Sequence, residues 1–150
     1  MEKQTPVLAT KEVQKHADST LKKESQVRHA VILAAGNGQR FREKGVELPK
    51  VLLKVGGLRL LERAILSLEN VGIKYFHVVV GAYKDQIVEV MSKSDRLKTF
   101  NIEYIECPDY NLGNGASFGA GAADIQAPFL LTMSDHIFST KTLQSFLKST

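Results

Sequence analysis

From residue 29 onward, short apolar segments alternate with segments in which apolar residues recur at helical spacing. The apolar segments predict strands over residues 30–34, 75–80, 101–105 and 129–133. The amphipathic segments predict helices around residues 60–70 and 85–93, a helix that begins near Asn114 and a last helix from about Lys141. Strands that alternate with helices are typical of a sheet covered on both faces. We therefore predict an α/β fold, a three-layer sandwich with a mostly parallel sheet.

The first 27 residues have a different texture. They are polar and poor in aromatic residues, and Val13, Ala17 and Leu21 are their only regularly spaced apolar candidates. Such a segment buries too little apolar surface to offset the entropy that ordering costs. We expect a polar tail or linker over residues 1–27 and a single domain over residues 28–150.

Composition narrows the class of protein. The chain has 150 residues, of which 43% are hydrophobic, and this is enough for one domain with its own core. The single cysteine, Cys107, cannot form an internal disulfide, and charged residues rather than an apolar signal segment follow Met1. No apolar run is long enough to span a bilayer. These features predict a cytoplasmic protein without a membrane segment.

The net charge of +4 raises the question of nucleic-acid binding. Six basic and four acidic residues lie before residue 30, which leaves 14 basic and 12 acidic residues in the remaining chain. A nearly balanced domain lacks the basic stripe that a duplex requires. We therefore expect no nucleic-acid partner.

Unusual residues follow the first and last predicted strands. Gly36 and Gly38 follow residues 30–34, and Asp135 follows residues 129–133. Ligands of parallel α/β sheets bind outside the carboxyl ends of the strands, where neighbouring loops meet. The sequence therefore places the candidate site at this edge of the sheet.

The glycine turn does not fit two common nucleotide motifs. Phe41 stands where a dinucleotide-binding fingerprint has its third glycine, and Lys50 lacks the Gly-Lys-Ser/Thr context of a P-loop. A glycine turn with outward amides, followed by Arg40 and Lys50, can still hold a polyanion such as a triphosphate. The alternative is a plain tight turn with a solvent-facing arginine.

Two separated blocks carry a more specific signal. The segment LAAGNGQR (residues 33–40), followed by LPK (48–50) and VLLKVGG (51–57), resembles the signature of the MobA-like and sugar-phosphate nucleotidyltransferases. The segments GNGAS (113–117) and LTMSDH (131–136) are most similar to the inositol-1-phosphate cytidylyltransferases. The resemblance implies the Rossmann-like fold of the nucleotide-diphospho-sugar transferases.

The resemblance also implies roles for individual residues. Arg40 would neutralise the β and γ phosphates, Lys50 would hold the α phosphate, and Asp135 would bind Mg²⁺, so that these three form the catalytic set. The implied nucleotide-binding residues are Leu33, Ala34, Ala35, Gly36, Asn37, Gly38, Lys50, Asn114, Gly115 and Ser117.

Two of these positions also have a purely structural interpretation. Asn114 and Ser117 would read the base, but Asn114 is equally suited to cap the helix that begins there. Asp135 would ligate the metal, but an aspartate at a strand end often only caps the next loop.

The function implied is transfer of a nucleoside monophosphate, CMP from CTP, to a phosphorylated acceptor such as inositol 1-phosphate. Alternatives are a sugar-1-phosphate uridylyl- or thymidylyltransferase, a molybdenum-cofactor guanylyltransferase, or a non-catalytic regulatory nucleotide-binding subunit. Family members continue beyond the point where this sequence stops, within its last predicted helix, and there supply a second metal-binding aspartate and most of the acceptor pocket. The resemblance therefore implies a nucleotide-binding part of a longer domain, which binds nucleotide but turns over slowly.

Overall fold

The computed structural model of the chain describes residues 27–38, 43, 45 and 47–149. The predicted tail, apart from Val27, lies outside the described residues, and so does the candidate phosphate-binding residue Arg40.

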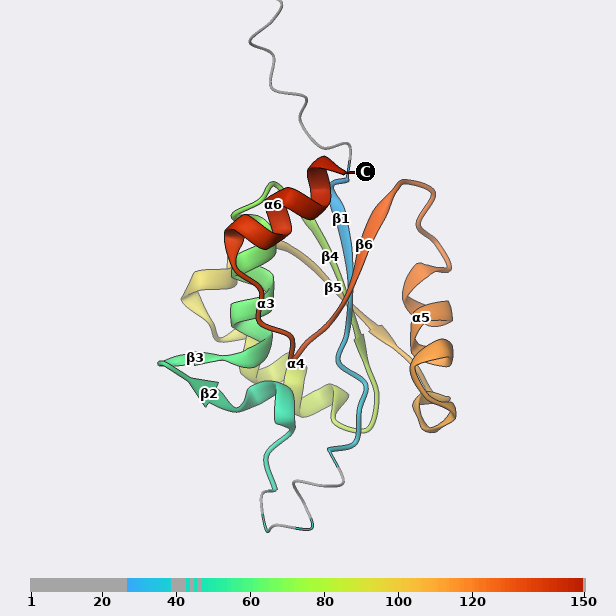
Figure 1. Cartoon of the computed structure of the whole chain (residues 1–150). Helices are drawn as coiled ribbons and strands as arrows, with labels where there is room; N and C mark the ends of the chain where they lie inside the picture. Colours follow the sequence, from blue (N-terminus) through green and yellow to red (C-terminus); the bar gives the residue numbers. More distant parts are fainter. Residues whose placement is uncertain (1–26, 39–42, 44, 46, 150) are drawn as a thin grey trace, which may run out of the picture.

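A parallel sheet forms the centre of the molecule (Figure 1). Its strands are β1 (His29–Leu33), β4 (Tyr75–Val80), β5 (Asn101–Glu106) and β6 (Phe129–Met133), in the order β5-β4-β1-β6. All neighbouring pairs run parallel. The central strand β1 is nearly all apolar because helices cover both of its faces.

The helices form a layer on each side of the sheet (Figure 1). They are α3 (Leu60–Glu69), α4 (Lys84–Ser92) and α6 (Thr140–Lys148) on one face and α5 (Asn114–Ala122) on the other. Successive side chains of β1 divide between these layers, since Ile32 belongs to the core under α3, α4 and α6 while Val31 belongs to the core under α5. The predicted three-layer α/β sandwich is therefore confirmed.

Predicted and observed element bounds agree closely. The strands at 75–80 and 129–133 match residue for residue, whereas the helix expected at 85–93 begins and ends one residue earlier. The last helix, expected from about Lys141, begins one residue earlier and ends at Lys148. In the part of the chain that the structure describes, no helix combines the length and apolarity needed to cross a membrane.

Short elements connect β1 to α3. A 3-10 helix, η2 (Lys50–Leu52), leads into a small antiparallel hairpin of β2 (Lys54–Val55) and β3 (Leu58–Arg59). The hairpin turns through Gly56 and Gly57, with φ of +60° and +81°. Two further 3-10 helices, η3 (Asp95–Leu97) and η4 (Tyr110–Leu112), precede β5 and α5.

Candidate functional site

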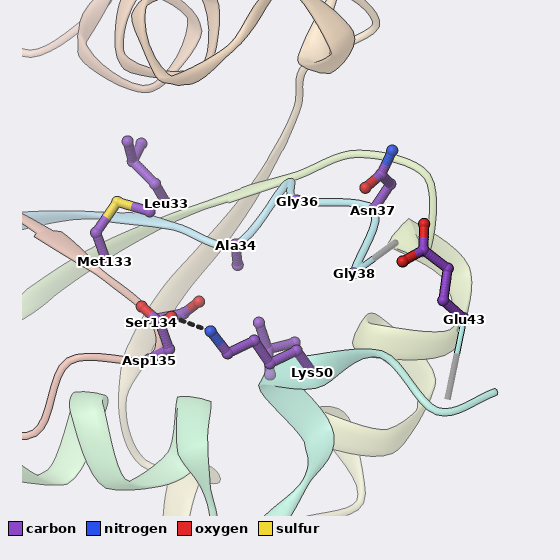
Figure 2. A pocket seen from close by; sticks show the side chains of 11 residues that line it. Leu33, Ala34, Gly36, Asn37, Gly38, Glu43, Lys50, Met133, Ser134 and Asp135 are labelled. Carbon is purple, nitrogen blue, oxygen red and sulfur yellow. Dashed lines mark hydrogen bonds and ion pairs between the residues drawn. The ribbon is translucent and has the colours of Figure 1, made fainter. Parts of the chain in front are cut away.

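A cleft of about 680 Å³ opens at the carboxyl ends of β1 and β6 (Figure 2). One wall consists of Leu33 and the glycine loop, by which we mean residues 34–38. The lining residues of this wall are Leu33, Ala34, Gly36, Asn37 and Gly38. Lys50 from η2 and Asp135 from the loop after β6 line the opposite side. The structure thus brings most of the predicted site residues together at the expected edge of the sheet.

The glycine loop is anchored at its start and open further along. The N–H of Ala34 donates to the carbonyl of Val79 at 2.8 Å, so pairing with β4 continues one residue beyond β1. Gly38 has a φ of +61°, a left-handed conformation that favours glycine. A Cβ at Gly36 or Gly38 would meet no atom of the described residues within 4 Å, so these residues leave the backbone open to a ligand. Exposed amides in such a turn are suited to hold an anion.

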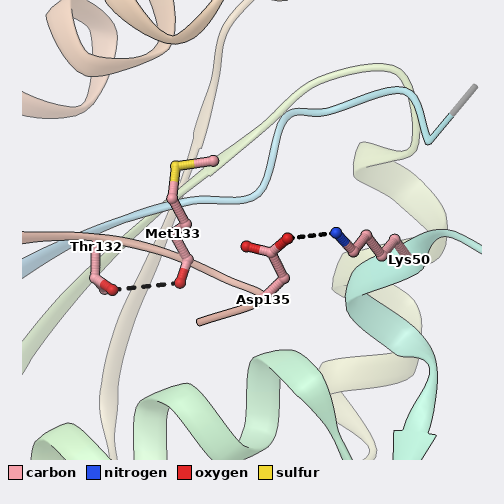
Figure 3. A network of polar contacts seen from close by, with 4 residues as sticks. All are labelled: Lys50, Thr132, Met133 and Asp135. Atoms are coloured by element: carbon pink, nitrogen blue, oxygen red, sulfur yellow. Dashed lines mark hydrogen bonds and ion pairs between the residues drawn. The ribbon is translucent and has the colours of Figure 1, made fainter. Parts of the chain in front are cut away.

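Lys50 owes its position to the buried residues beside it. Pro49 precedes η2, and its ring fixes φ at −53°. Val51 and Leu52, only 7% and 2% exposed, anchor η2 in the core. This leaves the Lys50 side chain to extend along the cleft toward the loop after β6 (Figure 3).

The Lys50 ammonium donates to Oδ2 of Asp135 and forms an ion pair with it (Figure 3). The pair joins elements 85 residues apart, and its side chains are 39% and 26% exposed. The Lys50 hydrogen bond holds the pKa of the Asp135 carboxyl below its usual value, so the carboxylate is charged at neutral pH. An aspartate that only caps its own loop would not account for this contact.

Asp135 is held in place by the sheet. The N–H of Ser134 donates to the carbonyl of Leu33 at 3.1 Å, which extends the pairing of β6 with β1 beyond the last residue of the strand. Ser134 itself is only 5% exposed. The carboxylate therefore projects from the rigid end of the sheet into the cleft.

The donor set could hold a divalent metal ion only with the help of a ligand. Among the described residues, no three or more His, Cys, Asp or Glu side chains cluster so that they could hold a metal. Asp135 contacts Lys50 on one side of the cleft, and Glu43 is the other carboxylate residue in the lining. Protein-bound Mg²⁺ usually has one or two carboxylate ligands and takes its other oxygens from water and substrate phosphates. Asp135 would supply the protein oxygen in such a site.

The candidate base-reading residues lie apart from the lining of this cleft. Asn114 and Gly115 are exposed at the start of α5, while Ser117 is 4% exposed and its hydroxyl donates to Sγ of Cys107 at 3.9 Å. The N-cap of α5 is Gly113, and Asn114 is the first helical residue. The alternative in which Asn114 caps this helix is therefore wrong. Base reading by these residues stays a prediction. The nucleotide contact of Ala35 also stays a prediction, since Ala35 is buried and does not line the cleft.

Sequence reasoning missed further lining residues. Val51, Met133 and Ser134 line the cleft, as does Glu43. The first three lie within two residues of Lys50 or Asp135 in the sequence, and that proximity could have indicated them. Glu43 lies in the loop between the glycine turn and η2, where no periodic pattern indicates which side chains face inward.

Comparison with known proteins identifies the family of this chain. The family described as MobA-like NTP transferase domain matches residues 30–150. A bifunctional IPC transferase and DIPP synthase of Aquifex aeolicus is 37% identical over 118 residues, and its namesake from Rubrobacter xylanophilus is 36% identical over 119 residues. Each alignment covers 79% of this chain, but 27% and 26% of the respective relatives. The chain thus spans about a quarter of the length of these relatives.

Solved structures show the same fold. The inositol-1-phosphate CTP transferase from T. maritima is 28% identical with a TM-score of 0.70, and the match covers 82% of this chain and 49% of that chain. A UDP-glucose pyrophosphorylase complexed with UDP-glucose is 21% identical with a TM-score of 0.64, over 82% of this chain and 54% of the other. These structures confirm the predicted nucleotide-diphospho-sugar transferase fold. Together with the match over residues 30–150, they show that this chain belongs to the family of MobA-like NTP transferase domains.

Proposed function

We propose that this chain binds CTP and forms the nucleotide-binding part of a transferase that moves CMP to inositol 1-phosphate and releases pyrophosphate. The observation that carries the proposal is the cleft in which Lys50 and Asp135 face the exposed backbone of the glycine loop. The cation, the carboxylate and the loop amides are the groups that a metal-bound triphosphate requires.

Each group has a distinct task in this proposal. The amides of Gly36, Asn37 and Gly38 bind phosphate oxygens, with Arg40 as a further candidate for the leaving pyrophosphate. Lys50 stabilises the negative charge that builds up on the α phosphate. Asp135 orients a magnesium ion, which when bound polarises the phosphoryl oxygens. Positioning and charge stabilisation of this kind are the main contributions that proteins make to phosphoryl transfer.

The transfer needs no nucleophile from the protein. A phosphate oxygen of the acceptor attacks the α phosphorus of the nucleotide and forms the new oxygen–phosphorus bond. The bond from that phosphorus to the bridging oxygen of pyrophosphate breaks, and pyrophosphate leaves with the electron pair. The acceptor phosphate is already ionised at neutral pH, so a strong general base is not required.

The choice of CTP and inositol 1-phosphate rests on similarity. The T. maritima structure is described as an inositol-1-phosphate CTP transferase, and the relatives from Aquifex and Rubrobacter are described as IPC transferases. The motifs at residues 113–117 and 131–136 support the same assignment. Met133 and Leu33 add an apolar wall to the cleft.

A two-stage experiment tests the proposal. Calorimetry with Mg²⁺ measures the affinity of the 150-residue chain for CTP, UTP, GTP, ATP and dTTP. Pyrophosphate release is then measured with inositol 1-phosphate and with glucose 1-phosphate as acceptors. We expect CTP to bind most tightly and pyrophosphate release to be slow but dependent on inositol 1-phosphate.

The outcomes distinguish the cytidylyl assignment from the broader nucleotidyltransferase assignment. Equal affinity for all five nucleotides would overturn the cytidylyl assignment, and the absence of any nucleotide binding would overturn the nucleotidyltransferase assignment. Tight CTP binding with no release from either acceptor would favour a regulatory subunit. As a control, Lys84→Met removes a lysine from the same edge of the sheet but outside this cleft, and its CTP affinity should equal that of the parent chain.

A further inference from the structure

The ion pair between Lys50 and Asp135 places a cation at the position where a metal would bind. We propose that the Lys50 ammonium competes with the metal for Asp135, so that metal and nucleotide bind this cleft cooperatively. This inference rests on the proposed function, because the nucleotide is the ligand that draws Lys50 away.

Lys50 and Asp135 are in direct contact. The ammonium of Lys50 donates to Oδ2 of Asp135, and the two side chains remain partly exposed to the cleft. A divalent ion needs the lone pairs of carboxylate oxygens. It therefore binds Asp135 only if Lys50 gives up part or all of this contact, and two cations on one carboxylate repel each other.

The protein supplies few metal ligands at Asp135. Among the described residues, Asp135 belongs to no cluster of three or more His, Cys, Asp or Glu side chains that could hold a metal. The described part of the protein thus offers a metal at Asp135 at most one further ligand of these types, so a metal that loses part of the Asp135 carboxylate to Lys50 is weakly held. In the absence of nucleotide, the Lys50 ammonium thus competes effectively with the metal for the Asp135 carboxylate, because it is covalently attached to the chain beside it.

A bound triphosphate would change the contacts of Lys50. The glycine loop lines the same cleft as Lys50, so a triphosphate bound by the loop amides brings its negative charge to the ammonium. Lys50 then exchanges the carboxylate for phosphate oxygens. This exchange frees Oδ2 of Asp135, and the phosphate also supplies the oxygens that the metal lacks.

Linkage makes the effect reciprocal. If nucleotide raises the affinity for metal by some factor, metal raises the affinity for nucleotide by the same factor. Lys50 therefore has two opposing effects: it strengthens nucleotide binding and weakens metal binding to the free protein. A lysine that serves only as a phosphate ligand would have the first effect alone.

A matched control lies at the same edge of the sheet. Lys84 pairs with Glu106 at 2.5 Å, and the side chains are 41% and 54% exposed. These residues line a separate cleft together with Gly81 and Tyr83. Replacing Lys84 removes the same charge without touching Asp135.

The experiment measures binding of Mn²⁺ to the nucleotide-free chain by electron paramagnetic resonance. The proteins are the parent chain, Lys50→Met, Lys84→Met and Asp135→Asn. For Lys50→Met we expect a Kd for Mn²⁺ about tenfold lower than that of the parent chain, within the roughly 5- to 150-fold range usual for coupled sites. Lys84→Met should resemble the parent, and Asp135→Asn should bind Mn²⁺ most weakly.

A second measurement repeats the titration with CTP present. CTP should raise the affinity of the parent chain for Mn²⁺, beyond the Mn²⁺ that free CTP binds, and the enhancement should be smaller in Lys50→Met. Thermal unfolding of each variant shows whether it is folded. Both lysines are partly exposed, so we expect the substitutions to leave the fold intact.

Each result bears on a different claim. An unchanged or higher Kd for Mn²⁺ in Lys50→Met would overturn the competition, even if CTP binds normally. Equal tightening in Lys50→Met and Lys84→Met would also overturn it, because general charge removal would then explain the effect. Failure of the parent chain to bind CTP would instead overturn the proposed function.

Discussion

Gly81 packs directly against the carbonyl oxygen of Ala35. A Cβ atom at Gly81 would lie 2.7 Å from this oxygen and 2.8 Å from Cγ of Tyr110, closer than real Cβ atoms approach. Ala35 belongs to the glycine loop, and Gly81 directly follows β4. The close packing at the end of β4 thus helps to position the glycine loop, although Gly81 itself does not line the cleft.

We expect Gly81→Ala to disturb this contact. The added methyl group must push away a backbone carbonyl or the Tyr110 ring, and overpacking of this kind costs about 1–3 kcal/mol of unfolding free energy. Because the carbonyl belongs to the glycine loop, CTP affinity should fall as well. Urea unfolding and calorimetry with CTP measure the two effects.

Gly119→Ala is the control for this substitution. Gly119 lies in α5, and a Cβ there would meet nothing within 4 Å. Alanine in place of a helical glycine stabilises by about 0.5–1 kcal/mol. If the two variants had the same stability and the same CTP affinity, Gly81 would not support the loop.

A second prediction concerns metal dependence. Asp135→Asn removes the carboxylate charge, so Mg²⁺ should no longer strengthen CTP binding, whereas EDTA should weaken CTP binding to the parent chain. The unfolding free energy should change by about 1 kcal/mol or less, because the Lys50–Asp135 pair is partly exposed. Calorimetry with CTP, with and without Mg²⁺, provides the measurement. Glu106→Gln, which breaks the other lysine pair at this edge, should keep the full Mg²⁺ effect.

A third prediction concerns the start of α3. Glu62 is only 2% exposed, and its carboxylate accepts a hydrogen bond from the backbone N–H of Arg59 at 2.9 Å. The carboxylate also lies 3.3 Å from Nη1 of Arg59. Glu62→Ala leaves these donors without their partner, which costs about 1–3 kcal/mol. The test is urea unfolding beside Glu69→Ala, which breaks a partly exposed pair with Lys74 on the same helix. An equal decrease in unfolding free energy in both variants would contradict the prediction that buried Glu62 stabilises the start of α3.

A fourth prediction concerns pH. His29 contacts His77 through a hydrogen bond of 3.1 Å, and the other ring nitrogen of His77 lies 3.0 Å from Glu103. Burial, and then the charge of His77, lowers the pKa of His29 below its ordinary value of 6.5. In the range just below that value the unfolded chain binds more protons than the folded chain, so the unfolding free energy decreases as the pH falls.

Urea unfolding between about pH 7.5 and 5.5 measures the slope of the unfolding free energy against pH. This pH range lies above the one in which carboxylates titrate. His29→Gln should flatten the slope. His136→Gln removes an exposed histidine and should leave the slope in place. A parent chain whose stability is constant over this range would contradict the prediction.

Much of the fold is predictable because three strands of the main sheet are mostly apolar segments, while β5 alternates polar and apolar residues, and all four lie between polar loops. The hairpin of β2 and β3 was missed for a physical reason: each strand has two residues, which is too short for any periodic pattern. The helix bounds shifted by a residue or two because terminal turns depend on local hydrogen bonds rather than on the apolar stripe.

The site was predictable where strand ends decide the geometry. β1 and β6 are neighbours and parallel, so the residues that follow them must meet, and Gly36 and Asp135 do line one cleft. Helix register decides the position of Ser117. Ser117 and Gly121 lie four residues apart on one face of α5, and that face packs on the sheet, where a Cβ at Gly121 would lie 2.5 Å from Val79. The motif alone does not contain this information.

The parallel sheet also constrains the order in which the protein can fold. His29 of β1 is in register with Tyr75 and with Phe129, which follow it by 46 and 100 residues. During synthesis, the central strand therefore emerges long before either neighbour, and contacts over such separations form slowly. Asp135 emerges just after β6, the last strand of the described sheet to be synthesised, so the binding cleft can assemble only once this strand has left the ribosome.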